Sequence, residues 1–252
     1  TFLAVADLTY RKANLEHAAA SLANVFQTLL LIALVGLVLA AGGAPDTTVA
    51  GIHPATVLLI AGYGYGLMLV RSTRDKPMWR PRRTRETVED DPDDGDDDRR
   101  STAVLWAWFA ALATVIALSG FAIANAGVSL VRETTLSGSV VGGLITSVLT
   151  SLPELITAVA AVRIGALTLA VGDIVGGNTF DILFIAVADL LYRPGSVYHA
   201  IDAETAFLLA LTVLLTAVLG AGLVHRGRRG IGFEGVGILV LYAVGVVSLL
   251  LR

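Results

Sequence analysis

The sequence contains no cysteine and has few charged residues outside one segment. The absence of cysteine excludes a disulfide framework or a thiolate metal site within this chain. Of its 39 Asp, Glu, Lys and Arg residues, 19 lie between positions 71 and 100, and only 20 are spread over the other 222 positions. A water-soluble domain has about a quarter of its residues charged. The distribution of charge therefore excludes a soluble globular fold.

Long apolar runs make up most of the chain, and each is close to the ~20 residues that a helix needs to cross the ~30 Å hydrocarbon core of a bilayer. Seven such runs occur, at residues 22–42, 49–70, 103–125, 139–162, 165–188, 205–224 and 231–251. They predict an all-α polytopic membrane protein with about seven transmembrane helices, located in the cell membrane. The chain begins at Thr1 in an apolar stretch too short to span. We therefore expect it to retain the end of one further helix, whose beginning is missing.

The basic residues predict an orientation, because cytoplasmic loops carry an excess of Lys and Arg. Numbering the spans in order places 15 basic residues on one side of the membrane and three on the other. The hydrophilic loop at residues 72–102 is on the richer side, so we expect it to be cytoplasmic. Its acidic run at residues 89–98 (EDDPDDGDDD) is of low complexity and is typical of a solvated linker.

One short motif occurs twice in the chain. Residues 4–11 read AVADLTYR and residues 186–193 read AVADLLYR, so seven of eight positions are identical. Five spans separate the copies, which places them on opposite sides of the membrane. This arrangement is typical of the inverted repeats of secondary transporters. We expect residues 1–71 to be the C-terminal part of a first inverted repeat, 72–102 the charged linker, and 103–252 a complete second five-helix repeat.

Three carboxylates lie deep within predicted spans: Glu154 in one, and Asp173 and Asp181 in the next, with Asn178 beside them. A charge at the bilayer centre costs about 2.5–3.5 kcal/mol on insertion scales, so each needs a partner or a function. A single residue of this kind could also serve only to hold helices together. The neighbouring residues favour function, because helical spacing gathers polar side chains into stripes. The stripes are Ser147, Thr150, Ser151 and Glu154 in the first span, and Asp173, Gly177 and Asp181 in the second.

Pro153 lies inside the first stripe and predicts a break in that helix. It lacks an N–H to bond the Leu149 carbonyl, and its ring displaces the preceding turn. The freed carbonyl, the two hydroxyls and the carboxylate are hard oxygen donors, which suit calcium, magnesium or sodium. Calcium takes about six to eight oxygens, of which this chain offers about half. A packing kink without an ion site is the alternative.

These residues resemble a known family. The segments TSLPE (150–154) and AVGDIVGGNTFD (170–181) are similar to the second alpha repeat of the cation/calcium exchanger superfamily, the sodium/calcium antiporters. The resemblance implies a ten-helix fold of two inverted five-helix repeats around a central ion site. It implies that Thr150, Ser151, Glu154 and Asp181 are ion ligands, with Glu154 shared between calcium and sodium; Pro153 and Asn178 also match the family pattern.

The chain departs from that family pattern at three positions. Leu149 stands where the family has Gly, and Gly177 where it has Ser, so one hydroxyl donor is lost and a sodium position is in doubt. Asp173 replaces the usual Asn and adds a possible negative charge to the expected site. The first alpha repeat, with its own glutamate, is absent from this chain. We therefore expect the chain not to transport alone.

The expected function is secondary antiport of calcium for sodium by alternating access, with the two ions and the lipid bilayer as partners and without a cofactor or nucleic acid. A calcium/proton antiporter is one alternative, favoured by Asp173. A non-transporting membrane scaffold or regulatory subunit is another, if the chain is naturally this short. An enzyme is not expected, because the four histidines, at 17, 53, 199 and 225, are dispersed near span ends and none accompanies a carboxylate in helical register.

Overall fold

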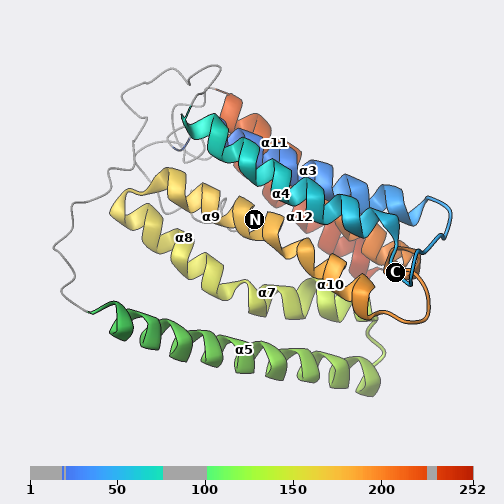
Figure 1. The fold of residues 1–252 in the computed structure, drawn as a ribbon. Coiled ribbons are helices and arrows are strands. Elements are labelled where there is room, and N and C mark those ends of the chain that lie inside the picture. Colours follow the sequence, from blue (N-terminus) through green and yellow to red (C-terminus); the bar gives the residue numbers. More distant parts are fainter. Residues whose placement is uncertain (1–18, 20, 76–100, 226–231, 252) are drawn as a thin grey trace. The chain divides into compact units, whose positions relative to one another are not determined.

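The structure is a computed structural model that describes residues 19, 21–75, 101–225 and 232–251. These residues fold into helices, and among them the only β-type pairing is one isolated bridge between Val49 and Ile52 (Figure 1). The longer helices are α3 (Leu22–Gly42), α4 (Pro54–Asp75), α5 (Thr102–Glu133), α8 (Leu152–Ile164), α9 (Leu167–Asp181), α10 (Leu183–Leu191), α11 (Ala203–Val224) and α12 (Phe233–Leu250). The short ones are α6 (Gly138–Val140), the π-helix η1 (Val141–Thr146), α7 (Ser147–Thr150) and the 3₁₀ helix η2 (Val197–Ala200).

The predicted all-α polytopic membrane protein is confirmed. Six helices in the described residues are long and apolar enough to cross a membrane, and a bent pair, Gly138–Thr150 with Leu152–Ile164, makes a seventh. The second span begins at Pro54 rather than at residue 49, because Ala50 and Gly51 adopt positive φ angles in a tight turn. Proline then suits the first helical position, where its missing N–H has no intrahelical partner. The third span continues eight residues beyond its predicted end, to Glu133.

The chain divides into two compact units, Thr1–Asp90 with Glu154–Arg252, and Asp91–Pro153. In the larger unit α3 is central and packs against α4, α9 and α11, while α12 packs on α11 and α10 on α4 (Figure 1). Its core includes Leu31, Leu34, Val38, Val171, Val175 and Leu219. Because lipid is as apolar as these side chains, close packing between helices supplies much of the stabilisation.

Helices α3 and α11 run antiparallel. Near the start of α3, the Thr28 hydroxyl oxygen lies 3.0 Å from where a Cβ on Gly220 of α11 would be. At the end of α3, a Cβ on Gly42 would lie 3.0 Å from the carbonyl oxygen of Tyr198, in η2 just before α11. The hairpins α3–α4 and α11–α12 thus meet through oppositely directed first helices. The first copy of the repeated motif, at residues 4–11, lies outside the described residues.

The smaller unit contains α5, α6, η1 and α7. Every residue of α5 is at least partly exposed within the described part of the chain. Between α5 and η1 lies an apolar cavity of about 340 Å³, lined in part by Gly127, Val131, Val141 and Gly142. A Cβ on Gly127 would lie 3.0 Å from the Thr146 hydroxyl oxygen, so glycine allows α5 and η1 to approach closely.

We expect Gly42→Ala to lower the free energy of unfolding by about 1 kcal/mol, because the new methyl group would press against the Tyr198 backbone carbonyl. Gly36→Ala in the same helix is the control. No atom lies within 4 Å of its Cβ position, so alanine should stabilise α3 by about 0.5–1 kcal/mol. Thermal unfolding in detergent measures both, and equal midpoints for the two variants would contradict the assigned contact.

Candidate functional site

The predicted break lies at Ser151. Helix α7 ends at Thr150, Ser151 has φ −90° and ψ 1°, and α8 begins at Leu152 with Pro153 in its first turn. The helix axes on the two sides of Ser151 differ in direction by 41°. Proline is tolerated in a first turn, where its missing N–H leaves no intrahelical bond unmade. The interruption therefore falls within the predicted polar stripe.

The hydroxyl groups next to the break bond to their own helix. Thr150 Oγ1 lies 3.1 Å from the Thr146 carbonyl oxygen and 3.2 Å from that of Ser147, and donates its proton to this pair. Ser147 Oγ donates to the Gly143 carbonyl at 2.6 Å. Because the protons point at backbone oxygens, the lone pairs of these hydroxyls remain able to face a cation. Thr150 and Ser151 belong to the smaller unit, while Glu154 is the first residue of the second segment of the larger one.

Helices α8 and α9 form a hairpin within the larger unit. The turn is made by Gly165, whose φ of +86° suits glycine, and the N–H groups of Gly165 and Ala166 bond back to the carbonyls of Val162 and Ala161. These two bonds form the Schellman arrangement, which satisfies carbonyls at a helix end. The chain is thereby reversed, so that α9 runs antiparallel to α8.

A side-chain hydrogen bond joins the two helices of this hairpin. Thr157 Oγ1 lies 3.1 Å from Asp173 Oδ2 and 3.0 Å from the Glu154 carbonyl oxygen, and its one proton is shared between them. The two helices are antiparallel, so one turn back along α8 corresponds to one turn forward along α9. Glu154 is therefore at about the same height along the hairpin as Gly177. Among the described residues, apart from its chain neighbours and the backbone of its own helix, no atom lies within 4 Å of the Cβ position of Gly177, so space is open beside this turn.

The polar stripe of α9 lies on the side away from its core contacts. Asp173 and Asp181 are exposed among the described residues, whereas Val171, Val175 and Thr179 are buried. Asn178 follows Gly177 by one residue, so the helix turns its side chain away from this stripe. Its Nδ2 donates to the Ile174 carbonyl at 2.7 Å. It also lines a cavity of about 190 Å³, with residues that include Leu31, Val175, Thr216 and Ile238. The structure therefore brings Asp173 to α8 and directs Asn178 toward a different space.

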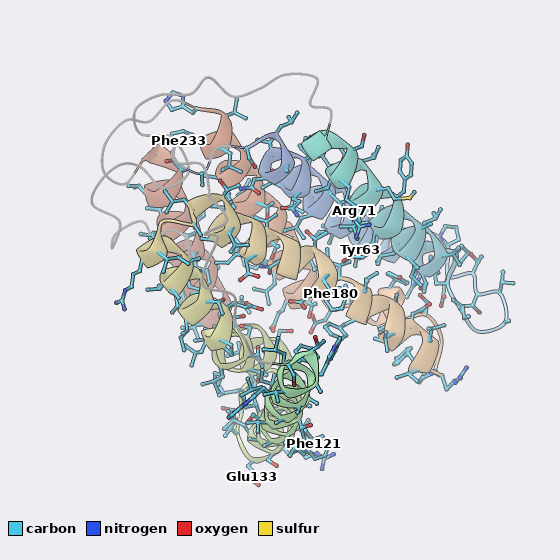
Figure 2. The ribbon with its side chains drawn as sticks, turned by 60° about the vertical axis from the view of Figure 1, so that its left-hand side comes forward. Tyr63, Arg71, Phe121, Glu133, Phe180 and Phe233 are labelled. Atoms are coloured by element: carbon cyan, nitrogen blue, oxygen red, sulfur yellow. The ribbon has the colours of Figure 1, made fainter. Side chains whose placement is uncertain are left out.

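Asp181 is the last residue of α9. Ile182, between α9 and α10, keeps helical backbone angles (φ −59°, ψ −26°), so the two helices continue one another in a single apolar span, Leu167–Leu191. Its neighbour Phe180 packs edge-on against Tyr63 of α4, with ring centroids 6.3 Å apart, and against Phe184 at 5.9 Å (Figure 2). The aromatic contacts fix the end of α9 next to Asp181. The span predicted at residues 165–188 is thus found as Leu167–Leu191, with a candidate ligand near its middle.

Two parts of the site were missed from the sequence. Thr157 lies three residues after Glu154 and continues its stripe by one turn, so helical spacing could have identified it. The contact between Tyr63 and Phe180 joins residues far apart in the chain, for which no local pattern exists. Among the described residues, no group of three or more His, Asp or Glu side chains converges to hold a metal ion.

A bundle of apolar helices, with a break beside a carboxylate and further carboxylates on the adjoining span, is the architecture of a membrane transporter for cations. The family model described as "Sodium/calcium exchanger protein" matches residues 104–251. The chain belongs to this family.

Two relatives support the assignment. The inner membrane protein YrbG of Escherichia coli (strain K12) is 31% identical over 149 residues, which cover 59% of this chain and 44% of that protein. The sodium/calcium exchanger MaX1 of Methanosarcina acetivorans is 30% identical over 112 residues, which cover 44% of this chain and 31% of that protein. The chain thus matches less than half the length of either relative. No solved structure matches it.

We expect Thr157→Val to lower the free energy of unfolding by about 1 kcal/mol, because it leaves Asp173 Oδ2 without this donor. Thr157→Ser keeps the hydroxyl and should remain close to the parent protein. Chemical unfolding in detergent of both variants, alone and combined with Asp173→Ala, measures the coupling. Strictly additive effects of Thr157→Val and Asp173→Ala would contradict the pairing.

Proposed function

We propose that the chain forms part of a secondary active antiporter that exchanges calcium for sodium at a carboxylate site between the membrane faces. The observation that carries this proposal is the position of Glu154, which follows the break at Ser151 and precedes Thr157, the partner of Asp173. Membership of the sodium/calcium exchanger family supports it, as does the similarity to the sodium/calcium exchanger MaX1 of Methanosarcina acetivorans.

The proposed ligands divide between the two sides of the break. The hydroxyls of Thr150 and Ser151 precede it, and the carboxylate of Glu154 follows it; Asp181 at the end of α9 supplies a second carboxylate. Asp173 adds charge near the site and Asn178 an amide oxygen. These are oxygen donors, as calcium and sodium prefer. A first inverted repeat would supply the remaining oxygens.

Coupling follows from competition for Glu154. If calcium and sodium exclude one another from the site, and the empty site does not change sides readily, each outward movement of one ion requires the return of the other. The sodium gradient then drives calcium against its own gradient. The chemistry needs no covalent step, which agrees with a family of transporters rather than enzymes.

The proposed membrane topology places residues 72–102 in the cytoplasm, between a first repeat ending near residue 71 and a second repeat at 103–252. This topology puts the loops at residues 43–53 and 192–202 together on the opposite side. The structure supports that pairing, because His199 Nε2 lies 2.7 Å from the carbonyl oxygen of Ala44. Arg193 also approaches Gly51.

Proton coupling is a second candidate, favoured by Asp173. The family pattern has Asn at this position, and the carboxylate lies within hydrogen-bond distance of Thr157. A carboxylate can take up and release a proton, which an amide cannot. Asp173 could therefore carry a proton in place of a sodium ion.

In the full-length protein reconstituted in vesicles, we expect Glu154→Gln to abolish sodium-driven calcium flux, because the amide keeps the shape but removes the charge shared by both ions. Glu133→Gln, at the exposed end of α5, is the matched control and should transport normally. Radioactive calcium uptake measures both. Normal flux through the Glu154→Gln protein would exclude this glutamate as the central ligand.

We expect Asp173→Asn to retain sodium-driven calcium flux, since it restores the amide typical of the family. The same vesicles given a pH jump in sodium-free buffer test the second candidate. Sodium exchange predicts no calcium flux under the pH jump in either protein. A flux in the parent protein that Asp173→Asn removes would instead establish proton exchange through Asp173.

A further inference from the structure

The aspartate of the repeated motif AVADLLYR has no role in the proposed ion site. Asp189 lies in α10, eight residues after Asp181, and its side chain is fully buried, with 0% exposed. A buried carboxylate is unfavourable unless hydrogen bonds replace the water it has lost. Its partners therefore indicate what the residue does.

Three donors from outside α10 bond to this carboxylate. Asp189 Oδ2 accepts from the backbone N–H of His53 at 2.9 Å and from Thr56 Oγ1 at 2.6 Å. Oδ1 accepts from the backbone N–H of Val197 at 3.2 Å. His53 and Thr56 lie at the start of α4, and Val197 begins η2, so one side chain joins α10 to two other elements.

The start of α4 is arranged around this negative charge. A carboxylate is stabilised at a helix N-terminus, where backbone N–H groups point outward. The ring Nδ1 of His53 accepts a hydrogen bond from the backbone N–H of Ala55 at 3.2 Å, while the backbone N–H of His53 donates to Asp189. The Thr56 proton is also directed at Asp189, so the Tyr198 hydroxyl, 2.9 Å away, is the donor to Thr56 Oγ1.

Tyr198 remains a donor because it is buried. Burial raises the pKa of its hydroxyl, the bond with Thr56 lowers it, and the charge of Asp189 raises it further. With its pKa raised overall, the phenol keeps its proton at neutral pH. The chain of hydrogen bonds therefore runs in one direction, from Tyr198 through Thr56 to Asp189.

The two helices that meet beside Asp181 are held by different partners. Helix α9 is attached near its start to α3, because Asn24 Nδ2 donates to the Thr168 carbonyl at 3.2 Å. Helix α10 is attached near its end to α4 and η2 through Asp189. Asp181 lies between these attachments, where α9 ends and α10 follows.

We propose that Asp189 is a positioning residue for the ion site: by attaching α10 to the start of α4 and to η2, it fixes the segment that follows Asp181 and so the place of that carboxylate. The expected effect of Asp189 on ion binding rests on the proposed function. Its expected effect on the position of α10 rests on the hydrogen bonds alone. The attachment also gives the second copy of the repeated motif, at residues 186–193, a physical role.

Calcium flux in the full-length protein tests the effect on ions. In Asp189→Asn one carboxylate oxygen is replaced by an NH₂ group, which cannot accept a hydrogen bond. This NH₂ faces either the backbone N–H of Val197, or the backbone N–H of His53 and the Thr56 hydroxyl. In either orientation at least one donor loses its acceptor. Thr56→Val removes one donor with little change of shape, and Thr56→Ser retains it. We expect the first two variants to raise the KM for calcium roughly fivefold to twentyfold with a maximal rate within about twofold of the parent, and Thr56→Ser to match the parent.

A purely structural role predicts a different result, namely less folded protein and a lower maximal rate with an unchanged KM. That result in Thr56→Val, or in Asp189→Asn where it folds, would overturn the positioning role. Thr56→Val carries the test if Asp189→Asn does not fold. Calcium flux through Glu154→Gln is measured in parallel. If that variant keeps its flux, the proposed function has failed, whatever the Asp189 and Thr56 variants show.

A distance measurement tests the attachment without transport. Cysteines introduced by Met68→Cys in α4 and Val187→Cys in α10, both at exposed positions, can carry spin labels for pulsed electron paramagnetic resonance. We expect a narrow distance distribution in the parent and in Thr56→Ser, and a broader one in Asp189→Asn and Thr56→Val. Equal widths in all four proteins would overturn the proposal even if calcium flux were affected.

Discussion

The need to satisfy polar groups away from water governs this structure. In hydrocarbon, every charge or unpaired backbone group requires a partner, so each polar residue in a span is a structural attachment or part of a functional site. Asp189 is of the first kind, because it is fully buried with three donors from neighbouring elements. We propose that Asp173 and Asp181 are of the second kind, because they lie on an exposed helix face. The same chemical group thus has two roles, distinguished by its surroundings.

Small residues determine how closely the helices that carry these groups approach. Gly220 faces Thr28, and the side chain of Leu30 occupies the space where Gly66 would have a Cβ. Such contacts hold α4 and α11 against α3, and α3 in turn holds α9 through Asn24. The buried face of α9 is fixed by packing, which leaves its opposite face for the carboxylates. The position of the candidate site therefore depends on residues that have no ion-binding chemistry.

Much of the fold follows from local patterns in the sequence. Apolar runs predicted the spans, and Pro153 predicted the interruption found at Ser151, because both are properties of neighbouring residues. The side on which Asn178 lies was not predicted. It depends on the packing of α9 against α3, α11 and α12, which are formed by residues distant in sequence. Helical periodicity identifies residues that share a face, but not what that face contacts.

The position of α3 at the centre of the larger unit has a consequence for biosynthesis. Asn24 and its partner Thr168 are separated by 144 residues. At a synthesis rate of about 5–20 residues per second, α3 waits for roughly 7–30 s before α9 exists to cover its polar side chains. During that interval Asn24, Gln27 and Thr28 face lipid, water or insertion machinery. The central helix of the bundle is therefore synthesised well before the helix that covers its polar side chains.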